Sequence, residues 1–177
     1  MEIYRLMKQV GLFIVLISQA FTSFASGACR GSTQTELAGD LVLQTAWLRA
    51  DRQWVGQFEL SNVAKSPRMV LQGTRETGGF FVDYPTVILE TQDAKFQWTP
   101  DNRDVIAGSF ISPDKWTVKP GAKVTFVSFL MSRENAPRSQ QVFRILLHTA
   151  RPDACIVSRP FHPIISGEEV TGFETSK

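Results

Sequence analysis

Apolar and polar side chains alternate along much of this chain, and the alternation restricts its fold more than any other feature. In residues 54–61, Trp54, Phe58 and Leu60 would share one face of an extended strand, with Glu59 on the other face. Long stretches with apolar residues at i, i+3, i+4 and i+7, which indicate amphipathic helices, do not occur in the sequence after its first thirty residues. The chain is therefore predicted to be all-β.

Further strand candidates share short β-branched or aromatic runs that are bounded by turn residues. They are residues 41–48, 69–71, 87–91, 94–98, 105–111, 116–118, 123–131, 141–148 and 155–158. Pro120-Gly121 supplies a turn, and residues 123–131 are predicted to pair with residues 141–148 as a hairpin. Short strands at this spacing predict a two-sheet sandwich of immunoglobulin-like architecture, with a small β-barrel as the alternative.

The N-terminus has the layout of a secretory signal peptide. Arg5 and Lys8 precede an apolar run at residues 10–17, which is too short to cross a bilayer, and small residues follow the run. Residues 1–25 are predicted to be the signal, with cleavage after Ala25 or Ala28. The mature protein is therefore expected to be exported, to the periplasm in the first instance, with secretion or lipid anchoring as alternatives.

The sequence contains two cysteines, Cys29 and Cys155, and an oxidising compartment allows them to form one intramolecular disulfide. Cleavage after Ala28 would instead make Cys29 the first residue of the mature chain and a candidate for lipid attachment. The residue three positions before it is Ser26, where a lipidation signal generally has an aliphatic side chain. The disulfide is the preferred prediction, and free structural cysteines are the third alternative.

About 150 residues remain after cleavage, which fits one domain with its own core. Residues 29–165 are predicted to form that domain, and residues 166–177 a flexible acidic tail. The formal net charge of the whole chain is +2. This near-neutral balance gives no reason to expect nucleic acid as a partner, and no membrane span is predicted.

The sequence offers no recognisable catalytic or cofactor motif. It lacks a Gly-x-Ser-x-Gly nucleophile turn and a phosphate-binding glycine loop. His148, Asp153, Cys155 and His162 are ligand types within fifteen residues, but their spacing fits no known zinc pattern. We therefore predict no enzyme activity, no cofactor and no metal.

Two regions are candidates for binding a partner protein. Residues 72–85 bring Arg75, Phe80, Phe81 and Tyr84 around a Gly78-Gly79 bend, and aromatic side chains on a loop supply contact area at low entropy cost. The competing interpretation is that Phe80 or Phe81 covers the core.

The second candidate is an arginine series with a local positive charge. Arg133 and Arg138 lie on a polar loop, and Arg144, Arg151 and Arg159 follow. Here the competing interpretation is solvated surface charge.

These observations predict a non-catalytic exported protein that acts by binding another protein, such as an inhibitor or an immunity-type protein against a toxin or hydrolase. One alternative is a subunit or chaperone of an exported assembly, which would pair an exposed strand edge with another chain. The other is an enzyme or small-molecule binder with an unrecognised site.

Overall fold

The alternating segments form strands, and these strands build the whole of the described structure. The computed structural model describes residues 35–63, 69–76, 79–82, 86–101, 114–137, 141–149 and 154–176, and it contains no helix in them. The strands are β1 (Thr35–Glu36), β2 (Gly39–Leu48), β3 (Gln53–Asn62), β4 (Met69–Glu76), β5 (Gly79–Phe81), β6 (Val87–Gln92), β7 (Trp98–Pro100), β8 (Asp114–Val118), β9 (Lys123–Ser132), β10 (Phe143–His148), β11 (Ala154–Val157), β12 (Phe161–Ser166) and β13 (Glu169–Thr175). The all-β prediction is confirmed.

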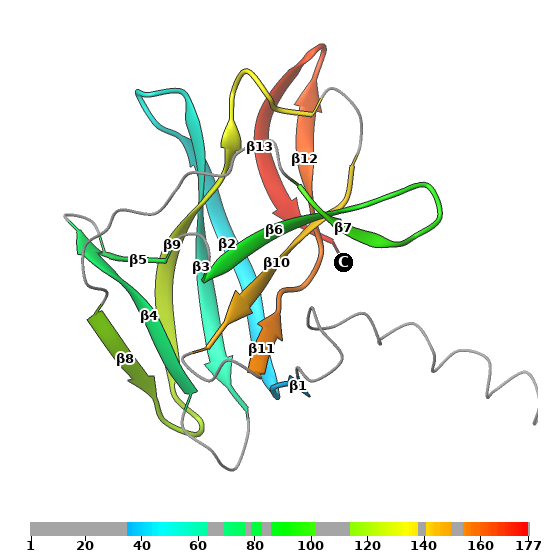
Figure 1. Cartoon of the computed structure of the whole chain (residues 1–177). Coiled ribbons are helices and arrows are strands. Elements are labelled where there is room, and N and C mark those ends of the chain that lie inside the picture. Colours follow the sequence, from blue (N-terminus) through cyan, green and yellow to red (C-terminus); the bar gives the residue numbers. More distant parts are fainter. Residues whose placement is uncertain are drawn as a thin grey trace, which may run out of the picture.

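The strands are divided between two sheets (Figure 1). The six-stranded sheet has the order β2-β3-β9-β5-β4-β8, and its long members β2, β3 and β9 are antiparallel. The seven-stranded sheet has the order β1-β11-β10-β12-β13, and β10 also pairs with β6, which continues to β7. The sheets do not close on themselves, so the β-barrel alternative is wrong.

The core lies between the sheets and is rich in phenylalanine. Phe58 on β3 stacks on Phe126 of β9, with ring centroids 5.7 Å apart, and its ring edge meets Phe161 of β12 at 6.0 Å. Phe143 of β10 lies 6.2 Å from Phe161. All four are fully buried, and each contributes roughly 2–3 kcal/mol of transfer free energy to folding.

The two sheets are joined along one edge, where β2 meets the strands that follow β10. Leu41 forms an isolated parallel bridge to Ser158, and the Arg159 N–H donates to the Leu41 carbonyl at 2.9 Å. The Thr175 hydroxyl donates to the Leu43 carbonyl at 3.0 Å. These bonds fix the orientation of the sheets at that edge.

The C-terminal segment is ordered, contrary to the predicted flexible tail at residues 166–177. Residues 169–175 form β13, which pairs antiparallel with β12 from Phe161↔Thr175 to Ser166↔Glu169. Phe173 is only 6% exposed and packs edge-on against Phe161 and Trp54. The acidic side chains point outward while this one apolar side chain enters the core, so local acidity did not indicate disorder.

Two local predictions are also wrong. Residues 123–131 and 141–148 do not form a hairpin, because β9 belongs to the six-stranded sheet and β10 to the seven-stranded sheet. The strand predicted at residues 94–98 is present only at Trp98, which begins β7, because residues 93–97 form the turn between β6 and β7. The predicted strand at residues 105–111 lies outside the described residues.

The predicted signal peptide and Cys29 also lie outside the described residues. Cys155 is fully buried on β11, and its sulfur is not a free thiol. The pairing of the two cysteines remains a prediction. In the part of the chain that the structure describes, no helix is long and apolar enough to cross a membrane.

Candidate functional site

The first candidate binding region places one of its aromatic rings inside the protein. Phe80 is 1% exposed and stacks on Trp116 of β8, with ring centroids 3.9 Å apart. Its predicted role in partner contact is therefore corrected: it is a core residue. Phe81, on the opposite side of the strand, is half-buried and meets Phe129 edge-on at 4.8 Å.

Arg75 is exposed at the surface, but its side chain contacts Trp116, the ring on which Phe80 stacks. Its guanidinium carbon lies 5.6 Å from the ring centre of Trp116, at cation–π distance. Arg75 thus covers the solvent side of the Trp116 and Phe80 pair. Tyr84 lies outside the described residues.

The arginine series does not form a patch of unopposed charge in the described residues. Arg133 pairs with Glu169 at 2.9 Å, and Arg159 makes a two-pronged contact with Asp40 at 3.0 and 2.9 Å. Arg144 also pairs with a carboxylate. Arg138 and Arg151 lie outside the described residues.

Arg144 is buried, so neither partner contact nor the competing interpretation of solvated surface charge applies to it. Its Nε donates to Glu90 on the neighbouring β6 at 2.9 Å, and the two side chains are only 9% and 4% exposed. The guanidinium carbon lies 4.2 Å from the ring centre of Trp98. A buried charge needs such partners, and they make Arg144 a structural residue.

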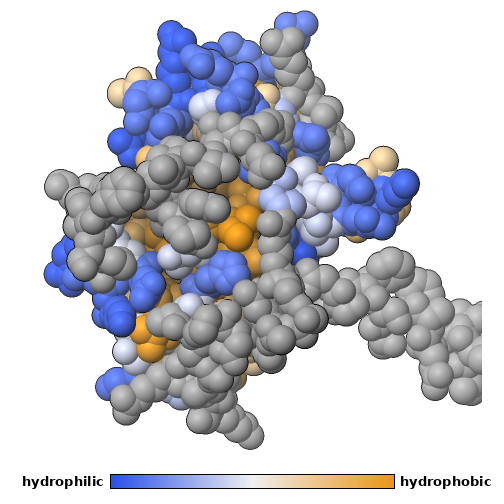
Figure 2. Space-filling model, viewed as in Figure 1, coloured by the Kyte–Doolittle hydropathy of each residue, from blue (hydrophilic) through white to orange (hydrophobic). Residues whose placement is uncertain are grey.

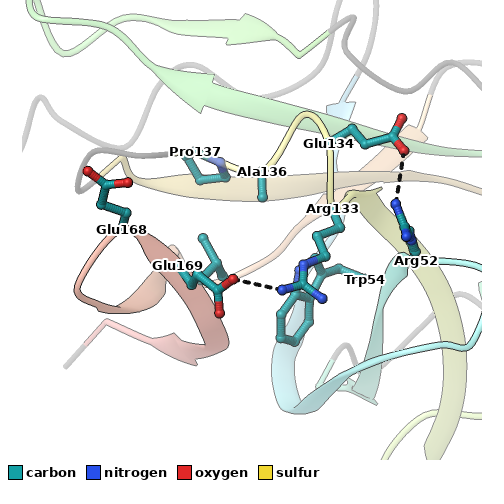
Figure 3. Close-up of a pocket in the computed structure, with 9 residues that line it drawn as sticks. Arg52, Trp54, Arg133, Glu134, Ala136, Pro137, Glu168 and Glu169 are labelled. Carbon is teal, nitrogen blue, oxygen red and sulfur yellow. Dashed lines mark hydrogen bonds and ion pairs between the residues drawn. The ribbon is translucent and has the colours of Figure 1, made fainter.

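A cleft of about 350 Å³ lies at one end of the sandwich, where three connections come together (Figure 3). They are the β2–β3 turn at residues 49–52, the segment after β9 at residues 133–137, and the β12–β13 turn at residues 167–168. The Arg133 N–H donates to the Arg52 carbonyl at 2.7 Å, which holds the first two together. Both sheets therefore contribute to the walls.

The walls of this loop-end cleft carry charges of both signs. Arg133 Nη2 lies 2.9 Å from Glu169 Oε1, and Arg52 Nη1 lies 3.8 Å from Glu134 Oε1. All four side chains are at least half exposed, so water screens these pairs and each is worth at most about 1 kcal/mol. Glu168 points away from both arginines (Figure 3).

Trp54 is the aromatic residue of the cleft. It is 4% exposed and is held from behind by Phe173, whose ring meets it edge-on at 5.4 Å. Its indole Nε1 is buried and has no hydrogen-bond partner among the described residues. Ala136, Pro137 and Val170 complete the less polar part of the lining.

Neither a family model, nor a curated protein, nor a solved structure matches the chain. What the cleft does must therefore be argued from its own residues. Among the described residues, the lining contains no Ser, Cys, Thr, Lys or His, so they form no Ser–His or Cys–His pair there. The described residues also contain no group of three or more side chains placed to hold a metal ion.

Sequence reasoning identified one residue of this cleft, Arg133. It missed Arg52, Trp54 and Glu169 as members of the same site, because they come from segments far from Arg133 in the chain, and it gave no binding role to the adjacent Glu134. The available signal was topological: loops at one end of a sandwich gather there. Using it requires strand pairings that alternation alone does not give.

Proposed function

We propose that this is a non-catalytic exported protein that acts by binding another protein, for instance as an inhibitor or an immunity-type protein against a toxin or hydrolase. The observation that carries the proposal is the loop-end cleft. It combines arginines and carboxylates from three connections with Trp54, on a scaffold whose sheets are joined by hydrogen bonds. Binding residues are commonly placed on loops that a rigid scaffold positions.

The residue types in the cleft suit recognition of a protein surface. Arginine is enriched among the residues that dominate interface energetics, whereas Trp54, which is 4% exposed, lines the cleft from the side of the core. Arg133 and Arg52 are exposed and already face carboxylates, so a partner can exchange these weak pairs for its own without a large desolvation cost. An immunoglobulin-like arrangement, in which loops at one end of the sandwich bind, is part of the proposal.

We further propose that residues 1–25 direct export and that Cys29 and Cys155 form a disulfide in the mature protein. The support is the N-terminal charge and apolar pattern, and the buried Cys155 that is not a free thiol. Intact mass of the mature protein without reductant should show cleavage after Ala25 or Ala28 and the loss of two hydrogens. A lipid-sized mass on Cys29 would replace the bridge with a membrane anchor.

The test of function is affinity capture from the exported fraction with the mature protein under mild washing. One protein in stoichiometric amount is expected, and Arg133→Ala should weaken its binding about tenfold or more. Lys123→Ala is the matched control, because Lys123 forms a comparable surface ion pair with Glu59 at 2.6 Å at the opposite end of β9. It should bind like the wild type.

Other outcomes would change the assignment. Recovery of no protein partner would contradict the proposal. Self-assembly through a strand edge would favour a subunit or chaperone of an exported assembly. A small molecule that competes at the cleft would favour the ligand-binding alternative, since the cleft volume lies within the range of small-ligand sites.

A further inference from the structure

The turn between β6 and β7 is closed by five hydrogen bonds, one of which runs from Gln92 Nε2 to the Phe96 carbonyl at 3.4 Å. The Asp93 N–H donates to the Gln97 carbonyl at 2.9 Å, and the Phe96 N–H donates to the Asp93 carbonyl at 3.0 Å. Asp93 Oδ1 accepts two more backbone N–H groups, from Lys95 and Gln97, both at 2.8 Å. The conformation of the turn is therefore fixed by Asp93.

Phe96 occupies the position of this turn that least suits it. Its φ is +61°, in the left-handed region that favours glycine or asparagine. The pattern matches the three-residue hairpin loop, in which glycine normally takes the left-handed position. A phenylalanine there strains the backbone.

Burial does not compensate for this strain. Phe96 is 75% exposed, the largest exposed fraction among the large apolar residues described. Arg52 is the other non-glycine residue with positive φ in the described part of the chain, but its carbonyl bonds Arg133 and its side chain pairs with Glu134. The backbone of Phe96 is also hydrogen-bonded, through its N–H to Asp93 and its carbonyl to Gln92, so what folding leaves without a reason is the exposed ring.

The hairpin also projects from the body of the protein (Figure 1). Figure 2 shows that most of this projection is hydrophilic. Asp93 and Lys95 lie in the same turn and are exposed. The hairpin tip is thus one apolar ring on a rigid polar arm.

We propose that this hairpin tip is an anchor that inserts the Phe96 ring into an apolar pocket of a partner protein. Fixed aromatic side chains that fill a partner's pocket dominate interface energies, because little entropy is lost when they bind. The inference rests on the proposed function only in that the partner is a protein. It concerns a surface separate from the loop-end cleft.

A membrane is the less suitable partner for this tip. A loop that inserts into lipid needs several apolar side chains and benefits from a cationic surround. Here one ring stands among the polar residues Gln92, Asp93, Lys95 and Gln97, whose formal charges cancel. A small pocket with a polar rim fits this arrangement better.

The first experiment places the photo-crosslinking analogue p-benzoylphenylalanine at position 96 or, as a control, at position 164. Ile164 is also an exposed apolar residue, 42% exposed, on β12. Irradiation in the exported fraction should give one discrete protein adduct from position 96 and none from position 164. Equal adducts from both positions, or no adduct from position 96, would overturn the proposal.

The second experiment measures the affinity of variants for the protein that the wild type captures. Phe96→Asn, which suits the left-handed position, should weaken binding about 30-fold or more without lowering the melting temperature. Asp93→Ala should weaken binding about tenfold while Asp93→Asn, which keeps an acceptor oxygen, stays near wild type. Ile164→Thr should also bind normally.

The outcomes separate this inference from the proposed function. If Phe96→Asn binds within about threefold of the wild type, the anchor is wrong but the protein-binding function stands. If the wild type captures no protein, the function fails and the anchor with it. If the wild type sediments with vesicles of zwitterionic and anionic lipid and Phe96→Asn does not, the partner is a membrane and the proposal is overturned.

Discussion

Substituting Gly73 by alanine tests the packing of the six-stranded sheet most sharply. Gly73 lies on β4, directly beneath the buried ring of Phe80. A Cβ at this position would stand 2.3 Å from the Phe81 carbonyl oxygen and 2.8 Å from Cε2 and Cζ of Phe80. The ring has no free space to move into, since it is stacked on Trp116 at 3.9 Å. Because one of the crowded atoms is backbone, a side-chain rotation is not enough to relieve the contact.

The magnitude follows from two opposing effects. Overpacking a well-packed core by one methyl group costs roughly 1–3 kcal/mol. Alanine restricts the unfolded chain more than glycine does, which stabilises the folded state by roughly 0.4–1 kcal/mol. The contact with a backbone oxygen puts the cost in the upper part of its range, so Gly73→Ala should lower the free energy of unfolding by about 2 kcal/mol. For a domain of about 150 residues, that corresponds to a fall in melting temperature of about 4–8 °C.

Chemical denaturation and thermal unfolding of the mature protein measure this effect directly. Gly172→Ala is the matched control on β13, because its Cβ would lie 3.5 Å from Ile164 Cδ1, an ordinary contact distance. The control should change the free energy of unfolding by no more than about 0.5 kcal/mol. If Gly73→Ala were as stable as the control, the close packing of Phe80 against β4 would be wrong.

Three further outcomes are expected. Glu90→Ala should lower the free energy of unfolding measured by chemical denaturation, with an upper limit of about 3–5 kcal/mol, because the buried Arg144 loses one carboxylate partner and keeps its contact with Trp98. Phe96→Asn should keep or raise the melting temperature, because it relieves a left-handed residue that costs about 1–2 kcal/mol. Reductant should lower the melting temperature of the mature wild type and leave that of Cys155→Ala unchanged. The corresponding loss in the free energy of unfolding has an upper limit of about 4–5 kcal/mol, the entropic contribution of closing so long a loop.

Strand positions were predictable where one face of the strand is buried and the other is exposed to solvent. Residues 41–48, 54–61 and 123–131 alternate in this way, and they correspond to β2, β3 and β9. Burial supplies the period of two that the sequence displays. β10 became visible for a different reason: residues 143–147 are buried on both faces, which gives a continuous apolar run with Arg144 inside it.

Strand pairing was not predictable from the same signal. The hairpin proposed for residues 123–131 and 141–148 used their closeness in sequence, which is a fair expectation for two antiparallel neighbours. The chain instead crosses from one sheet to the other between β9 and β10. Alternation indicates that a strand has one face toward the core, but it does not indicate to which of the two sheets the strand belongs. The loop-end cleft depends on this crossing, so it remained hidden for the same reason.

The β6–β7 turn shows how a failed local prediction locates a functional candidate. Residues 94–98 were predicted to be a strand from their aromatic residues, and the segment contains neither glycine nor asparagine, the residues that mark a left-handed turn position. The structure places Phe96 at that position with φ of +61°. The β2–β3 turn repeats the arrangement with Arg52, at φ of +64°, beside the loop-end cleft. Sequences agree with their fold at most positions and depart from it where another requirement applies. The exposed ring of Phe96 adds no buried area to the fold, and its backbone conformation is unfavourable for a phenylalanine, so contact with a partner is the requirement that we propose for it.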